Sequence, residues 1–138
     1  MTNADNQTNW HWAEGIKFAL EGVKLLFLLN GAASVSVLTF IGNVRPCSGL
    51  LIGALLAFAI GAASTIPAMT MAYLTQLHYG NASINDSADI DTWRTAGKFH
   101  YWAYAFMALG LACFLTGITL AAFGLWNIPS TASCPTHA

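Results

Sequence analysis

Charged side chains are scarce in this sequence, because Asp, Glu, Lys and Arg together make up 8% of its 138 residues. Soluble domains contain about 25% charged residues, so most of this chain is not suited to face water. The charges are also nearly balanced, with five basic and six acidic residues. Nucleic-acid binding needs a concentrated basic surface, and the shortage of Lys and Arg excludes that class.

The sequence also lacks the motifs that usually carry catalysis. It has no glycine-rich phosphate loop, no Gly-x-Ser-x-Gly turn and no pair of carboxylates within an apolar segment. The acidic stretch 85–91 lacks the glycine and the distant glutamate of an EF-hand loop. We therefore expect a protein that is not an enzyme and that has no cofactor.

What the chain does contain is three long apolar segments, at residues 25–42, 50–73 and 101–126. A helix needs roughly 20 apolar residues to cross the hydrocarbon core of a bilayer. The sequence therefore predicts an all-α integral membrane protein, a bundle of three transmembrane helices in one domain that spans residues 1–138. The polar segment 76–98 is expected to form the cytoplasmic loop. No proline interrupts residues 10–44, so the first helix is expected to extend beyond the membrane on the cytoplasmic side.

Four of the five basic residues lie on one predicted side of the membrane. Lys17 and Lys24 lie before or at the start of the first apolar segment, and Arg94 and Lys98 lie just before the third, whereas Arg45 is alone in the first connection. The positive-inside rule places such a majority in the cytoplasm. We expect a bacterial inner-membrane protein with a cytoplasmic N-terminus and a periplasmic C-terminus.

The second and third apolar segments each carry small residues at a regular spacing. The spacing is four residues in the second segment, at Gly49, Gly53, Ala57 and Gly61, and seven residues in the third, at Ala103, Gly110, Gly117 and Gly124. Such stripes allow the backbones of membrane helices to approach closely. They serve either contacts within one subunit or contacts between copies, and their extent favours a homo-oligomer or a larger membrane complex.

Asn30 is the one side-chain amide deep in the predicted hydrocarbon region. Its residue count from the helix end places it near Ser64, Thr65 and Thr116 of the other helices. We expect an interhelical hydrogen bond to one of these hydroxyl groups. The alternative is that Asn30, Ser34, Thr65 or Thr116 lines a polar path for water or an ion.

Three histidines, His11, His78 and His100, come from three different helices but share one predicted depth at the cytoplasmic interface. Glu14 lies one helical turn from His11. Nitrogen ligands and a carboxylate could together hold a metal such as zinc. The alternative is that they are ordinary interface residues, because no two histidines have the close His-x-x-x-His spacing of a local metal site.

The sequence has three cysteines, and two of them share a predicted compartment. Cys47 lies in the outer connection and Cys134 in the outer tail, where disulfides persist. They form either a disulfide or two free thiols. Cys113 lies within the third apolar segment and is expected to be a small packing residue.

The first helix contains the segment Phe27-Leu-Leu-Asn-Gly-Ala-Ala33, followed by Phe40-Ile-Gly-Asn43. In these segments the chain resembles small, functionally uncharacterised bacterial membrane proteins that have a Leu-Leu-Asn-Gly sequence in the first helix. The resemblance implies no activity and no catalytic residues.

Three hypotheses about function follow from these features. The first is a non-enzymatic membrane protein that self-associates or serves as an accessory subunit of a larger complex. The second is a pore-forming or membrane-perturbing effector of holin or phage-defence type. The third is a metal or redox carrier at the cytoplasmic interface.

Overall fold

The computed structural model of the chain describes residues 3–44, 48–84 and 90–127, and it is all-helical over these ranges. The helices are α1 (Asn3–Val44), α2 (Gly49–Ile84) and α3 (Ile90–Trp126). Side chains are described for residues 14–44, 48–79, 91 and 94–127. The predicted all-α class with three long apolar helices is confirmed.

Each helix contains a segment long and apolar enough to cross a membrane. These segments are Glu14–Val44, Gly49–Tyr79 and Arg94–Trp126, of 31, 31 and 33 residues. At 1.5 Å per residue each is more than about 45 Å long, which exceeds the roughly 30 Å of a hydrocarbon core. Their length and composition indicate a multi-pass membrane protein.

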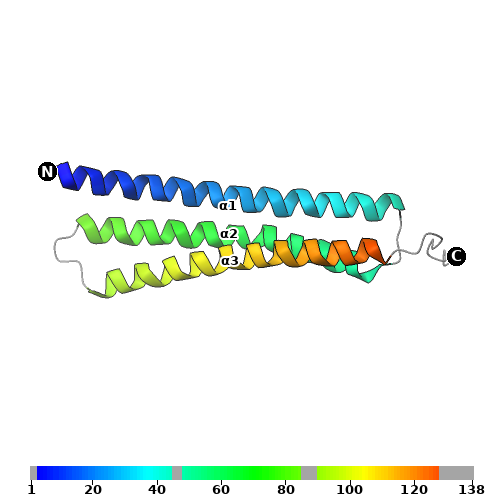
Figure 1. Cartoon of the computed structure of the whole chain (residues 1–138). Helices are drawn as coiled ribbons and strands as arrows, with labels where there is room; N and C mark the ends of the chain where they lie inside the picture. Colours follow the sequence, from blue (N-terminus) through cyan, green and yellow to red (C-terminus); the bar gives the residue numbers. More distant parts are fainter. Residues whose placement is uncertain (1–2, 45–47, 85–89, 128–138) are drawn as a thin grey trace.

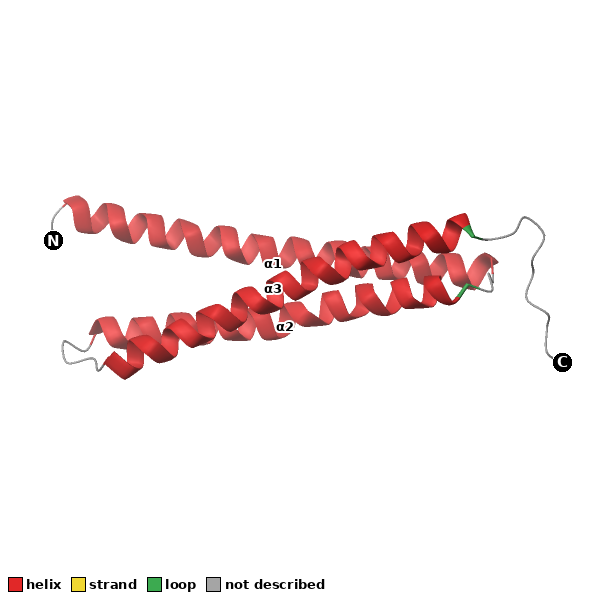
Figure 2. Ribbon diagram, turned by 60° about the horizontal axis from the view of Figure 1, so that its bottom comes forward, coloured by secondary structure: helices red, strands yellow, loops and turns green. Residues whose placement is uncertain are grey.

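The three helices lie side by side with alternating direction (Figure 1). The start of α1, the end of α2 and the start of α3 lie at one end of the bundle, which we call the N-terminal end. The helices α2 and α3 form a closely packed hairpin. The helix α1 separates from this hairpin toward the N-terminal end of the bundle (Figure 2), so it is the least integrated of the three helices.

The helices are longer than the apolar segments that predicted them. Residues 76–84 continue α2 and residues 90–98 begin α3, so most of the expected loop 76–98 is helical. No proline interrupts these polar residues, and a helix that is already formed gains one hydrogen bond for each residue it adds. The helix α1 begins at Asn3, seven residues before the proline-free run 10–44 from which the first helix was predicted.

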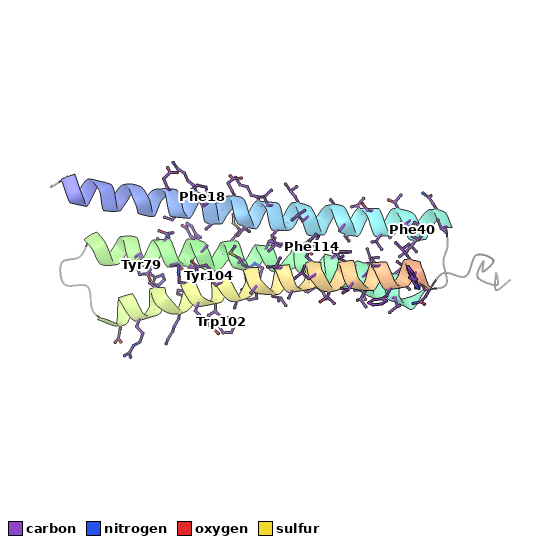
Figure 3. The ribbon with its side chains drawn as sticks, in the orientation of Figure 1. Phe18, Phe40, Tyr79, Trp102, Tyr104 and Phe114 are labelled. Carbon is purple, nitrogen blue, oxygen red and sulfur yellow. The ribbon has the colours of Figure 1, made fainter. Side chains whose placement is uncertain are left out.

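The glycines of α3 give the α2–α3 hairpin its close packing. A Cβ at Gly117 would lie 2.6 Å from the Phe58 ring, and a Cβ at Gly124 would lie 3.0 Å from Leu51 Cγ. The Phe58 ring also packs against Phe114, labelled in Figure 3, with 5.9 Å between ring centroids. Each glycine therefore provides the space that a large side chain of α2 occupies.

The small residues of α2 contribute unequally to this packing. Gly61 is buried, whereas Gly53 and Ala57 are half-buried. A Cβ at Gly53 would make only an ordinary contact of 3.5 Å with Leu120. The contacts made at Gly61, Gly110, Gly117 and Gly124 all lie within one subunit. These glycines therefore do not provide a surface for a second copy, although the expected homo-oligomer was inferred from them.

We predict that Gly117→Ala destabilises the hairpin by about 1–3 kcal/mol, the usual cost of overpacking a core, because the new methyl group would overlap the Phe58 ring. Thermal unfolding of the detergent-solubilised protein, followed by circular dichroism, measures the effect. The matched control is Gly97→Ala, because a Cβ at Gly97 on the same helix would meet nothing within 4 Å.

The control variant should retain stability or gain up to about 1 kcal/mol from the better helix propensity of alanine. Adding Phe58→Leu to Gly117→Ala should recover part of the loss, because the smaller side chain frees the space. Equal stability of the Gly117→Ala and Gly97→Ala variants would contradict the packing described for Gly117.

Candidate functional site

Asn30 joins α1 to the hairpin at the centre of the bundle. Its side chain is 0% exposed. The amide Nδ2 donates a hydrogen bond of 3.0 Å to the Leu26 carbonyl of its own helix and one of 3.4 Å to the Gly110 carbonyl of α3. The second bond is possible because Gly110 has no side chain to cover its carbonyl. Asn30 therefore forms an interhelical hydrogen bond between α1 and α3.

The other end of the same amide lies against α2. The oxygen Oδ1 is buried, and no N–H or O–H group donates to it. A Cβ atom at Gly61 would overlap Oδ1. Glycine has a Cα hydrogen in place of the Cβ atom, and this hydrogen points at Oδ1. Such Cα–H···O contacts between helices contribute about 0.5–1 kcal/mol. Asn30 thus contacts all three helices, and Gly61 is the residue that admits it. We call this contact of Asn30 with Gly61 and Gly110 the Asn30 junction.

The hydroxyl groups expected to bond Asn30 do not do so. Ser64 Oγ donates to the Gly61 carbonyl at 2.8 Å, and Thr65 Oγ1 donates to the Ala62 carbonyl at 2.7 Å. Thr116 is exposed on the outer side of α3. The expectation was wrong because helical Ser and Thr residues bond carbonyls of their own preceding turn, which leaves backbone carbonyls as the partners of Asn30.

The polar lining that a pore would need is not assembled within one subunit. Asn30 and Thr65 are buried, Ser34 is half-buried and Thr116 is exposed. These side chains therefore do not face one common space in the part of the chain that the structure describes. The Asn30 junction closes the centre of the bundle with side-chain and backbone contacts.

A groove lies between the three helices, on the N-terminal side of the Asn30 junction. Toward the same end of the bundle, α1 separates from the hairpin (Figure 2). The groove has a volume of about 620 Å³. Its walls are formed by residues within 15–23 of α1, 68–76 of α2 and 100–107 of α3. This size falls in the range of about 300–1,000 Å³ typical of small-molecule pockets. We call it the α1 groove.

The residues proposed as metal ligands have other contacts. His78 Nδ1 donates to the Leu74 carbonyl at 2.8 Å, and the ring packs against Phe99. His100 makes an edge contact with Tyr104, with 4.6 Å between ring centroids. Glu14 accepts a hydrogen bond of 2.7 Å from Lys17. No group of three His, Cys, Asp or Glu side chains comes together among the described residues, and the side chain of His11 lies outside them.

The predicted disulfide lies outside the described residues, because both Cys47 and Cys134 fall in ranges that the structure does not describe. Cys113 is half-buried and forms no disulfide.

The α1 groove was not found from the sequence, although a signal for it exists. Small residues occur one helical turn apart on two helices that face each other, at Gly15 and Ala19 of α1 and at Ala68 and Ala72 of α2. Small residues at a regular spacing were expected to mark close packing between helices. At this level they line a groove, because α1 and α2 are not in contact there. Only the direction of α1 distinguishes such a groove from a close contact between the helices.

Comparison of the chain with protein-family models, curated proteins and solved structures found no match.

We predict that Asn30→Ala lowers the stability of the bundle. The variant loses the hydrogen bond to Gly110, and interhelical hydrogen bonds in membranes contribute about 0.6–2 kcal/mol. It also leaves a small cavity, which adds to the loss. Thermal unfolding in detergent measures the change, and Asn43→Ala is the matched control because Asn43 is exposed on the same helix. A stability loss no larger than that of Asn43→Ala would contradict the role given to Asn30.

Proposed function

We propose that this chain is a non-enzymatic membrane subunit that associates, through the outward face of α1, with copies of itself or with another membrane protein. The observation that carries the proposal is a stripe of small and polar residues on the C-terminal half of α1. Ala32, Ser36, Thr39 and Asn43 follow one another at spacings of four and three residues, and all four are exposed. We call them the α1 outer stripe.

The α1 outer stripe has the chemistry of a helix contact surface in a membrane. Its hydroxyl groups are already bonded to their own helix, since Ser36 Oγ donates to the Ala32 carbonyl and Thr39 Oγ1 donates to the Val35 carbonyl, both at 2.8 Å. A second helix could therefore approach Ser36 and Thr39 without leaving either hydroxyl group unpaired. Small side chains at this spacing let the two backbones come close, which favours association by van der Waals packing.

The remaining features of the site support a binding role over catalysis. The Asn30 junction has the geometry of a structural contact, because its amide is sealed between three helices. Lys17 and Lys24 pair with Glu14 and Glu21 on the surface of α1 at 2.7 and 2.6 Å. This charged face lies nearer the N-terminal end of the same helix, where it is available to a water-soluble part of a partner complex.

Cysteine cross-linking tests the proposed contact. In a background of Cys47→Ser, Cys113→Ala and Cys134→Ser, the variant Thr39→Cys should form disulfide-linked dimers in oxidised membranes. The matched control is Leu38→Cys, because Leu38 is also exposed but lies about 100° away around the helix.

Dimers from Thr39→Cys and few from Leu38→Cys are the expected result for self-association. If Thr39→Cys instead cross-links to a different membrane protein, the accessory-subunit form of the proposal is supported. Equal cross-linking of both variants, or none of either, would contradict the α1 outer stripe as the contact surface.

We further propose that the N-terminal end of the bundle faces the cytoplasm of a bacterial cell. Lys17, Arg94 and Lys98 lie in the parts of α1 and α3 nearest this end, as the positive-inside rule requires.

Alkaline phosphatase fused after Ala138 should accordingly be active, because that enzyme needs the periplasm. Green fluorescent protein inserted at residue 87, between α2 and α3, should fluoresce, because it becomes fluorescent in the cytoplasm. The opposite pattern of activity would reverse the orientation and leave the three-span architecture intact.

A further inference from the structure

We propose that the α1 groove binds one acyl chain of a membrane phospholipid, with the polar headgroup held at the N-terminal end of the bundle. The groove lies within the three membrane-spanning segments Glu14–Val44, Gly49–Tyr79 and Arg94–Trp126. Ala68 and Met107 lie within the apolar segments 50–73 and 101–126, so the deep part of the groove lies at the level of the hydrocarbon. Gln76 and His100 lie just outside these segments, so the other end of the groove lies at the level of the headgroups. This role is separate from association through the α1 outer stripe, which lies on another part of α1.

The side chains along the groove change from polar to apolar with depth. Tyr73, Gln76 and His100 line the part nearest the N-terminal end of the bundle, because α2 runs toward that end and α3 runs away from it. Val23, Ala68 and Met107 line the deep part, about two helical turns farther from that end. A phospholipid has the same order of polarity, with a polar head at the interface and an apolar chain within the bilayer.

The deep end of the groove is closed by contacts next to the Asn30 junction. A Cβ at Gly22 would lie 3.8 Å from Met107 Cε, and a Cβ at Gly110 would lie 2.8 Å from Leu26 Cδ2. The helices α1 and α3 therefore meet at these residues. An occupant must enter from the N-terminal end or from the side, as a lipid chain does.

The apolar walls also exclude the alternative that water fills the deep part of the groove. A buried water needs two to four polar partners, whereas Val23, Ala68 and Met107 provide only apolar side chains there. An empty space would lose the contacts that its walls could make, and in a bilayer the neighbouring molecules are acyl chains. Methionine side chains such as Met69 and Met107 adapt well to a flexible chain.

The headgroup would meet hydrogen-bonding groups from two helices. The rings of Tyr73 and His100 and the amide of Gln76 are exposed at this level. Tyr104, labelled in Figure 3, lies one turn deeper on α3 and also lines the groove. These groups donate and accept hydrogen bonds, which suits the phosphate and ester oxygens of a phospholipid.

Photo-crosslinking tests the proposal on the full chain. The protein is placed in phosphatidylcholine vesicles that contain a small share of phosphatidylcholine with a diazirine on its acyl chain. After illumination, mass spectrometry locates the labelled residues. Val23, Ala68 and Ala103 line the groove but are only 6%, 1% and 8% exposed, so labelling of these residues requires a chain inside the groove. Leu115 is exposed on the outside of the bundle, so its labelling measures the reaction with bulk lipid and serves as the reference.

A variant that fills the groove provides the control on specificity. Ala72→Trp places a large ring within the groove and should abolish the labelling of Ala68 and Ala103 relative to that of Leu115, because the ring occupies the space that the acyl chain would enter. Ala63→Trp is the matched control, because Ala63 is exposed on the opposite side of α2, and it should leave the labelling unchanged. If Ala72→Trp does not fold, Ala19→Trp fills the groove from the exposed surface of α1.

Three results would overturn the proposal. The first is a wild-type protein labelled at Leu115 but at none of the groove residues, which would mean that α1 closes against the hairpin. The second is labelling of Ala68 and Ala103 that persists in both groove-filling variants. The third is cross-linking that joins groove residues to a second copy of the chain, which would make the groove a protein interface.

Discussion

One buried amide fixes the arrangement of the three helices. Asn30 is fully buried within a helix apolar enough to cross a membrane, so its amide must find its partners within the protein. Its nitrogen bonds the Gly110 carbonyl and its oxygen lies on the backbone of Gly61. Both partners are glycines, because only a backbone without a Cβ can come so near. The position of α1 on the hairpin thus depends on the Asn30 side chain and on the glycines at positions 61 and 110.

The Asn30 junction separates two regions of the bundle that are packed differently. On one side of the Asn30 junction, Phe58 and Leu51 fill the spaces beside Gly117 and Gly124, and the α2–α3 hairpin is closely packed. On the other side, α1 separates from the hairpin (Figure 2), and the α1 groove lies between the three helices. The same helix therefore offers two surfaces, a groove near one end of the bundle and the exposed α1 outer stripe near the other. These are the two surfaces through which we propose that the subunit contacts lipid and a neighbouring protein.

The sequence predicted the number and type of the helices well, because length and apolar composition determine membrane spans almost alone. It also identified Asn30 as a residue that needs a partner, and Gly61 and Gly110 as points of close contact. It did not identify Gly110 as the partner of Asn30, since backbone carbonyls are present at every position and only the rotation of each helix selects one. The α1 groove escaped prediction for a similar reason. Small residues such as Ala19 and Ala72 occur both where two helices are in contact and where a groove separates them. The direction of α1 decides between these cases, and that direction depends on the packing of the whole bundle.

The helix ends were also misjudged. Residues 76–84 and 90–98 are polar and were expected to form a loop, but they continue helices that the membrane segments have already nucleated. Polarity marks the end of the hydrocarbon region and not the end of the helix.

The most direct test of the account is a double-mutant cycle between Asn30 and Gly61, measured as thermal stability in detergent. In the wild-type background, Gly61→Ala should destabilise the protein, because the new methyl group would overlap the Asn30 amide. In the Asn30→Ala background, the same Gly61→Ala change should be neutral or should stabilise the protein by up to about 1 kcal/mol, as alanine does in an open helix position. The effect of Gly61→Ala on stability should therefore change sign between the two backgrounds. Equal destabilisation in both backgrounds would show that Asn30 and Gly61 do not meet, and would contradict the account.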